Sequence, residues 1–183
     1  MLSRLWLLAL PAFLVLAACD SHDHDHGGHA NLGRVVIETR PTTSAQTIAE
    51  WRRGQGWVTN NVPALTVAGE AENFGRASWT VRMFDGAGNE IAMEGGRDAN
   101  GNRVCLTPYS ARYAVTGDAV FNPGNAVTVN VGGAAREVFH CDHIHVYPRQ
   151  AGTAQLRLLL WHNDHDDAAT DPLSIQVNAA PLP

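Results

Sequence analysis

The chain contains no lysine, so its 13 basic residues are all arginine, and they face 18 acidic residues. The formal net charge is −5, and the arginines do not gather into a basic patch or run. Proteins that bind nucleic acid or anionic lipid electrostatically concentrate positive charge on one surface. We therefore expect no nucleic-acid partner, and an acidic surface that is compatible with attracting cations.

Catalytic motifs and long apolar runs are also missing. The sequence has no His-Glu-x-x-His motif, no Gly-x-Ser-x-Gly motif and no glycine loop of the phosphate-binding type. Beyond residues 1–18, no stretch is apolar enough to span a bilayer, which requires roughly 20 residues. These absences favour a binding protein over an enzyme.

Residues 1–18 have the pattern of a secretory signal peptide, with Arg4 ahead of an apolar run and small residues before Cys19. The tetrapeptide Leu16-Ala17-Ala18-Cys19 resembles the lipobox of bacterial lipoproteins. The resemblance implies cleavage before Cys19, lipidation of that cysteine, and a periplasmic protein tethered to the lipid bilayer by acyl chains. Asp20 resembles the enteric signal for retention at the inner membrane, with the outer membrane as the alternative. An ordinary signal peptide or a short anchor helix is the alternative to lipidation.

From Arg34 onward, short β-type segments recur about every ten residues and are separated by glycine, asparagine and aspartate. We expect residues 34–183 to form an all-β domain, an immunoglobulin-like antiparallel β-sandwich of about seven to nine strands. The polar residues 19–33 are expected to be a lipidated, flexible, His/Asp-rich tether. The segment 42–53 is ambiguous between a short helix and a non-helical conformation, and the second is slightly favoured. The strands are expected at 35–37, 62–72, 77–84, 90–93, 103–107, 111–116, 126–131, 136–147, 154–162 and 172–178.

Two cysteines remain once Cys19 is set aside. In an oxidising compartment, Cys105 and Cys141 predict one disulfide. The alternative is that Cys141 is a metal thiolate, because histidines and an aspartate surround it in Phe139-His140-Cys141-Asp142-His143.

Histidine is absent from residues 30 to 139, and the nine histidines lie in three clusters on either side of that gap. Aspartates interleave with them. Imidazole nitrogen and carboxylate oxygen are the ligands that borderline divalent metals prefer. We therefore expect a zinc cofactor, with copper and nickel as alternatives. The clusters are His22, His24, His26 and His29; His140, His143 and His145; and His162 and His165.

The second and third clusters are expected to meet. In a strand over 136–147, His143 and His145 lie on one face. Antiparallel pairing with a strand over 154–162 would then place His140 beside His162, so that one rim of the domain collects up to five histidines. Asp142, Asp164 and Asp166 are available to ligate the ion or to orient the imidazoles. The predicted ligands are His140, His143, His145, His162, His165 and Asp164.

The first cluster, in residues 22–29, resembles the mobile His/Asp-rich loops of periplasmic zinc-uptake and zinc-binding proteins. The resemblance implies weak metal binding by His22, His24, His26 and His29. A flexible tether of this kind raises the local metal concentration beside the folded domain. An inert polar spacer is the alternative.

Together these features predict a membrane-tethered periplasmic protein that captures, buffers or delivers a divalent metal ion. The receiver would be a metal transporter or an apo-metalloprotein. One alternative is an immunoglobulin-like adhesion or assembly module whose histidines are incidental or sense pH. Another is a metalloenzyme, because a β-sandwich with a His-x-His pair and a disulfide is similar to copper/zinc superoxide dismutase. The rest of that family's ligand order is missing from the sequence.

Overall fold

The computed structural model describes residues 29–40, 45–67, 77–117, 120–124, 126–131 and 134–180. These residues form fifteen strands joined by turns and loops, and they contain no helix. Within the same ranges, therefore, no helix has the length and apolar character needed to cross a bilayer. The expected all-β sandwich is confirmed, although its strands outnumber the seven to nine expected, partly because some are only two to four residues long.

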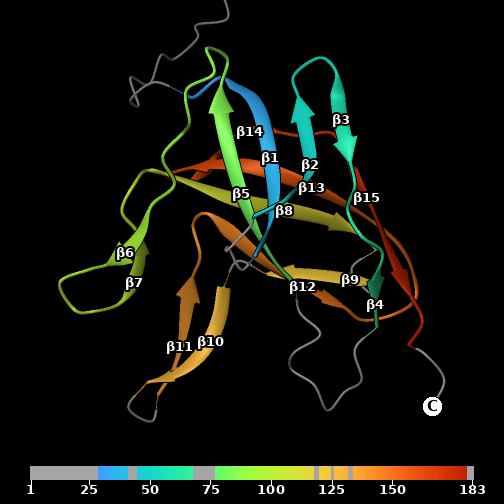
Figure 1. Ribbon diagram of the computed structural model, residues 1–183. Helices are drawn as coiled ribbons and strands as arrows, with labels where there is room; N and C mark the ends of the chain where they lie inside the picture. Colours follow the sequence, from blue (N-terminus) through green and yellow to red (C-terminus); the bar gives the residue numbers. More distant parts are fainter. Residues whose placement is uncertain are drawn as a thin grey trace, which may run out of the picture.

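The first sheet has six antiparallel strands in the order β3-β2-β1-β5-β12-β9 (Figure 1). The first three strands along the chain lie side by side, since β1 pairs with β2 and β2 pairs with β3. β12 comes from far along the sequence and pairs with β5 on one side and β9 on the other. The strands are β1 (Leu32–Arg40), β2 (Thr47–Arg52), β3 (Gly56–Asn60), β5 (Ala77–Asp85), β9 (Phe121–Gly124) and β12 (His143–Pro148).

The second sheet is built around the longest strand, β13 (Gly152–His162), which pairs with β8 on one edge and with β14 and β15 on the other. β4 extends this sheet by a parallel pairing with β15. Two separate two-stranded sheets, β6 with β7 and β10 with β11, complete the strands (Figure 1). The remaining bounds are β4 (Leu65–Thr66), β6 (Gly95–Arg97), β7 (Arg103–Cys105), β8 (Tyr109–Thr116), β10 (Ala126–Val131), β11 (Ala134–Phe139), β14 (His165–Ala169) and β15 (Leu173–Asn178).

The core lies between the two large sheets. On β13 every second residue is buried, because side chains alternate between the faces of a strand. The inward set of Leu156, Leu158 and Leu160 packs into one cluster with residues of the first sheet such as Val35 and Trp79. Each fully buried side chain of this size contributes roughly 1.5–3 kcal/mol. The core therefore fixes the ends of β12 and β13, from which the histidines project.

A hydrogen-bonded link between the sheets lies at Asp171, an exposed residue just before β15. The indole N–H of Trp51, on β2, donates to its carboxylate at 2.8 Å. The indole N–H of Trp57, on β3, donates to its backbone carbonyl at 2.9 Å. Residues 45–53 of the ambiguous segment 42–53 are non-helical, as favoured, and contribute β2 to the first sheet, while residues 42–44 lie outside the described residues.

Three expectations about strands are wrong. The segment 136–147 is not one strand, since β11 ends at Phe139 and β12 begins at His143, with a turn between them. β12 and the neighbouring β13 do not pair either, because β12 belongs to the first sheet and β13 to the second. Residues 90–93 likewise form no strand, and Glu90 makes only an isolated bridge to Phe84. The expected disulfide is confirmed: Cys105, at the end of β7, and Cys141, in the turn before β12, are bonded, with their Cα atoms 5.7 Å apart.

Candidate metal centres

The described histidines gather into two groups that share no residue. We call them the His29 group and the three-histidine group. In each group, one candidate ligand atom per residue lies within 4.8 Å of all the others. Both groups could hold a metal ion. The His29 group consists of His29, His162, His165 and Asp167, and the three-histidine group of His140, His143 and His145.

The expectation of a single rim with five histidines is therefore wrong. It depended on antiparallel pairing of the segments 136–147 and 154–162. Because β12 pairs with β5 and β9 instead, the histidines of the 140s and those of the 160s join different groups.

The hairpin of β13 and β14 builds most of the His29 group. Its turn has only two residues, so His162 and His165 are paired directly across it. Asn163 in the turn has a φ of 52°, a left-handed conformation that asparagine tolerates better than most residues. The pairing register shifts between Leu160 and Trp161, which leaves Asp167 as the extra residue of a bulge. Bulges re-aim side chains, and this one accompanies the placement of Asp167 among the imidazoles.

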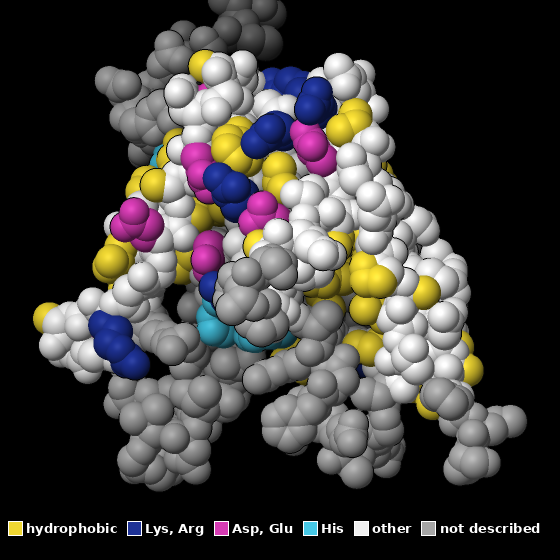
Figure 2. All heavy atoms as spheres, in the orientation of Figure 1, with side chains coloured by type: hydrophobic (Ala, Val, Ile, Leu, Met, Phe, Trp, Pro, Cys, Tyr) yellow, Lys and Arg dark blue, Asp and Glu magenta, His cyan; other side chains and the backbone are white. Residues whose placement is uncertain are grey.

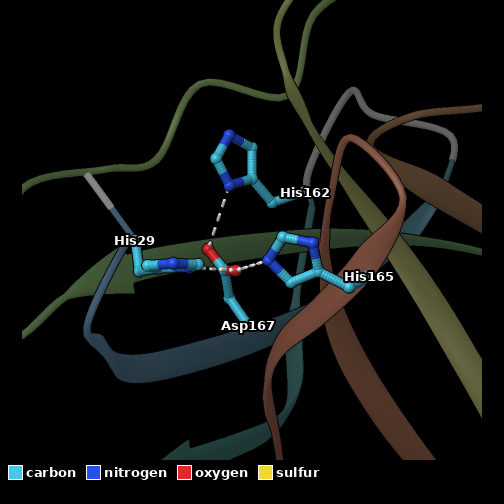
Figure 3. Close-up of side chains that lie close together, drawn as sticks. All are labelled: His29, His162, His165 and Asp167. Carbon is cyan, nitrogen blue, oxygen red and sulfur yellow. Dashed lines mark hydrogen bonds and ion pairs between the residues drawn. The ribbon is translucent and has the colours of Figure 1, made fainter. Parts of the chain in front are cut away.

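The Asp167 carboxylate is the centre of the His29 group (Figure 3). Nδ1 of His29 lies 2.8 Å from Oδ1, Nε2 of His165 lies 3.0 Å from Oδ1, and Nδ1 of His162 lies 3.5 Å from Oδ2. The backbone N–H of Ala30 also donates to Oδ2, at 3.3 Å. The Asp167 side chain is 0% exposed, whereas that of His29 is 60% exposed. A shielded carboxylate faced by three imidazoles offers a mixed nitrogen and oxygen ligand set.

Two ring nitrogens of this group lack hydrogen bonds although they are buried. Nδ1 of His162 and Nε2 of His165 have no partner of acceptable hydrogen-bond geometry among the described residues. Both nitrogens face Asp167 oxygens, at 3.5 Å for His162 and 3.0 Å for His165, so the carboxylate is their one neighbour in the group. A divalent ion bound by the group would satisfy both nitrogens, so these residues fit such an ion.

The other ring nitrogen of each of these two histidines has a hydrogen-bond partner of its own. Nδ1 of His165 donates to the Asp164 carboxylate at 2.8 Å, and the Asn163 amide lies 3.1 Å from Nε2 of His162. Tyr109 stacks on the His162 ring, with the ring centroids 4.5 Å apart. The Asp164 contact keeps the proton of His165 on Nδ1 and so leaves Nε2 available to a metal ion, whereas the Asn163 amide nitrogen and Tyr109 orient the His162 ring.

The charges in the His29 group shift two pKa values. Burial by itself would raise the pKa of Asp167, but the hydrogen bonds from His29 and the Ala30 N–H and the charge of His162 outweigh it, and the pKa is lowered. The hydrogen bond to Asp164 raises the pKa of His165, assisted by the charge of Asp167. The carboxylate is therefore held in its charged form, which is the form that binds cations.

β12 and the turn before it build the three-histidine group. His143 and His145 share one face of β12, while Ile144 and Val146 on the other face enter the core. His140 comes from the turn and lies next to the bonded Cys141. The His140 ring centroid is 4.0 Å from that of His143 and 4.9 Å from that of His145. Nε2 of His140 and Nε2 of His145 are 3.3 Å apart.

Oxygen partners also orient the rings of the three-histidine group. Nδ1 of His143 donates to the Asp142 carboxylate at 2.7 Å, and Nδ1 of His145 lies 2.7 Å from the Ser78 hydroxyl. Ser78 is placed there by the β5–β12 pairing, in which it lies opposite His145. The hydrogen bond from His143 lowers the pKa of Asp142 despite its partial burial, and the charges of His143 and Arg40 add to this effect. With Nδ1 held, the ligand atom that His143 and His145 offer is Nε2.

The predicted site residues thus fall into three sets. All five histidines of the 140s and 160s belong to one group or the other. Asp164, predicted as a ligand, lies outside the grouped atoms with its side chain 90% exposed, and it orients His165 instead. His29, expected in a weak tail, is part of a folded group. Cys19, His22, His24 and His26 lie outside the described residues.

Asp167 is the residue that sequence reasoning missed. It follows Asp164 and Asp166 in the same acidic stretch, and regular alternation gives no reason to prefer it. Its place depends on the bulge opposite Leu160 and Trp161, which no turn residue in the sequence marks.

Comparison with models of known protein families finds no match for this chain, and comparison with curated proteins finds none either. The functional argument therefore depends on the two groups themselves.

Proposed function

We propose that this protein binds divalent metal ions at both groups and serves to capture, buffer or deliver them. One observation carries the proposal. In each group, ring nitrogens of three histidines converge on one place, and in several of these rings the other nitrogen has a separate hydrogen-bond partner. The convergence of three rings in each group is typical of metal ligation.

Zinc is the first choice of metal, because it accepts nitrogen and oxygen ligands at about 2.0–2.2 Å in tetrahedral geometry. Copper(II) and nickel(II) also bind imidazole and are the alternatives. The described ligand atoms include no thiolate, since Cys105 and Cys141 are bonded to each other. That ligand set favours zinc over metals that need soft sulfur ligands.

The location we propose is the periplasm, with lipid on Cys19 attaching the protein to the inner membrane. This proposal is supported by the lipobox Leu16-Ala17-Ala18-Cys19 and by the disulfide, which is stable in an oxidising compartment. His22, His24 and His26 lie a few residues ahead of His29, so ions that they bind weakly are released beside the His29 group. The ion then passes to a metal transporter or an apo-metalloprotein.

Zinc titration of the metal-free full chain by calorimetry tests the proposal. We expect two sites per chain with Kd values below about 1 μM, each worth more than about 8 kcal/mol of binding free energy. His165→Ala should remove one site and His143→Ala the other, whereas Gln155→Ala, an exposed residue of β13, should leave both. A wild-type chain without a submicromolar site, or a double variant that retains both sites, would overturn the proposal. Elemental analysis of protein from its native membrane identifies the metal.

A further inference from the structure

We infer that the His29 group is the site at which the protein exchanges its ion, and that His29 is the ligand replaced there by an incoming aromatic nitrogen donor, an imidazole or a pyridine. The incoming nitrogen gives a lone pair to the ion as the bond from His29 breaks, so the charge of the ion and the number of its ligands are unchanged. The ion of the three-histidine group exchanges more slowly. This inference rests on the proposed function and assigns the transfer step to one of its two groups.

The first observation is that the four residues of the His29 group are held unequally. The side chains of Asp167 and His162 are 0% and 4% exposed, whereas that of His165 is 40% and that of His29 is 60% exposed. The first three belong to the paired strands β13 and β14, but His29 precedes the first residue of β1. Figure 3 shows His29 and His165 on opposite sides of the Asp167 carboxylate. Movement of His29 therefore uncovers one side of a bound ion while the strands keep the other ligands in place.

The second observation is a hollow of about 630 Å³ beside the group. Of the four residues of the group, His29 is the one that lines this hollow. Tyr109, which stacks on the His162 ring, lines it as well, together with apolar residues such as Ile91 and Pro108. Sites for small molecules are typically concave, mostly apolar and about 300–1,000 Å³ in volume. An aromatic ring therefore has room beside the place that His29 would leave.

The carboxylates that line the hollow already have partners, so the hollow suits an incoming ligand better than a second ion. Asp85 accepts hydrogen bonds from the backbone N–H groups of Ala87 and Asn89. Glu90 is paired with Arg82. Acidic side chains also lie beside arginines on the face of the molecule shown in Figure 2. The residues that would hold the ion therefore remain those of the His29 group.

The third observation is the burial of the three-histidine group. His140, His143 and His145 are each 8–9% exposed. β12, which contains His143 and His145, is paired with β5 on one side and with β9 on the other. An incoming donor reaches these buried rings less easily than it reaches His29. We therefore expect the two groups to differ in the rate at which they release an ion.

Zinc transfer to the dye pyridylazoresorcinol measures this exchange, because the dye binds zinc through its pyridine nitrogen and changes colour. The full chain, held in detergent and loaded with zinc at both groups, is mixed rapidly with excess dye. We expect a fast phase, whose rate rises with dye concentration, and a slow phase. His165→Ala should lose the fast phase and His143→Ala the slow one. His29→Ala should transfer the zinc of its own group at least about 10-fold faster than the wild type, because the ligand to be replaced is already absent.

Ala92→Trp tests the role of the hollow. Ala92 is exposed and lines the hollow without belonging to either group, so the added indole should occupy part of the space. We expect the fast phase to slow several-fold while the zinc Kd from calorimetry stays the same. Val58→Trp is the matched control, since Val58 is 44% exposed on β3 and does not line the hollow. Ala87→Trp, at another exposed residue of the lining, serves as a second variant should Ala92→Trp not fold.

Failure of this inference is distinguishable from failure of the proposed function. If calorimetry finds no zinc site in the wild type, the proposed function fails. If both groups bind zinc but the fast phase persists in His165→Ala, or both groups release zinc in one phase, the inference is wrong. It is also wrong if the fast rate is independent of dye concentration, or if a folded Ala92→Trp or Ala87→Trp variant releases zinc as fast as Val58→Trp. Circular dichroism checks the folding of each variant.

Discussion

The most direct consequence of two separate groups is that metal ions should stabilise the fold in two independent increments. A ligand that binds only the folded state stabilises it by about 2.7 kcal/mol when its free concentration is 100 times Kd. For a chain of 150–250 residues, 1 kcal/mol raises Tm by about 2–4 °C. Each group should therefore contribute about 5–10 °C to the metal-dependent rise in Tm, and the wild type about 10–20 °C.

Thermal unfolding of four proteins tests this consequence: the wild type, His143→Ala, His165→Ala and the double variant, each with and without zinc. The metal-dependent rise is compared within each protein, so that the direct effect of a substitution on the metal-free fold cancels. Because the groups share no residue, the two losses should add. A single substitution that abolishes the whole rise would show one shared site and would refute the two-group reading. An unchanged rise in the double variant would show that zinc acts elsewhere.

Three further predictions concern other parts of the structure. The disulfide between Cys105 and Cys141 closes a separation of 36 residues, so Cys105→Ser should lower the free energy of unfolding in denaturant by about 4 kcal/mol on the chain-entropy model. The same variant should weaken zinc binding at the three-histidine group alone, and loss at the other group would contradict this reading. His29→Ala should weaken zinc binding at its own group by at least about 10-fold in a calorimetric titration, since a ligand is lost as well as a positioning contact; equal weakening of both groups would count against it. Leu158→Ala, at a fully buried position, should cost about 2–5 kcal/mol by chemical denaturation, against less than about 0.5 kcal/mol for Leu106→Ala, which is 59% exposed.

The sequence predicts most of the β13 strand, which was expected over residues 154–162. Leu156, Leu158 and Leu160 alternate with more exposed residues, and His162 continues the inward series by one further step. It is 3% exposed for that reason. The same alternation correctly predicts that His143 and His145 share one face of a strand while Ile144 enters the core.

The sequence does not predict which strands pair. A linker of a few residues between β12 and β13 suggests a hairpin, because short connections usually join antiparallel neighbours. Here the chain crosses from one sheet to the other, and β5, from much earlier in the sequence, becomes the partner of β12. Long-range pairing of this kind depends on how the whole core packs. Local alternation of side chains contains no information about long-range pairing. The single-rim hypothesis was therefore wrong because it paired the segment 136–147 with the next strand along the chain.

Both groups include a residue from a place where regular strand alternation is interrupted. Asp167 enters the His29 group through the bulge opposite Leu160 and Trp161, and His140 enters the three-histidine group from the turn that separates β11 from β12. Along a regular strand, every second side chain lies on the same face, so two imidazoles can lie close together but no third donor points toward them.

A bulge or turn changes the direction of one side chain and can point it at the pair. Hydrogen bonds, a disulfide or paired strands must then hold that side chain in place. The Cys141 disulfide, next to His140, has this role in one group, and the Ala30 N–H, which donates to Asp167, has it in the other. Asp142, Ser78 and Asp164 orient His143, His145 and His165, which lie on the strands. Departures from the regular pattern that are fixed by several contacts are typical of functional sites, and this is the physical reason to regard both groups as binding centres.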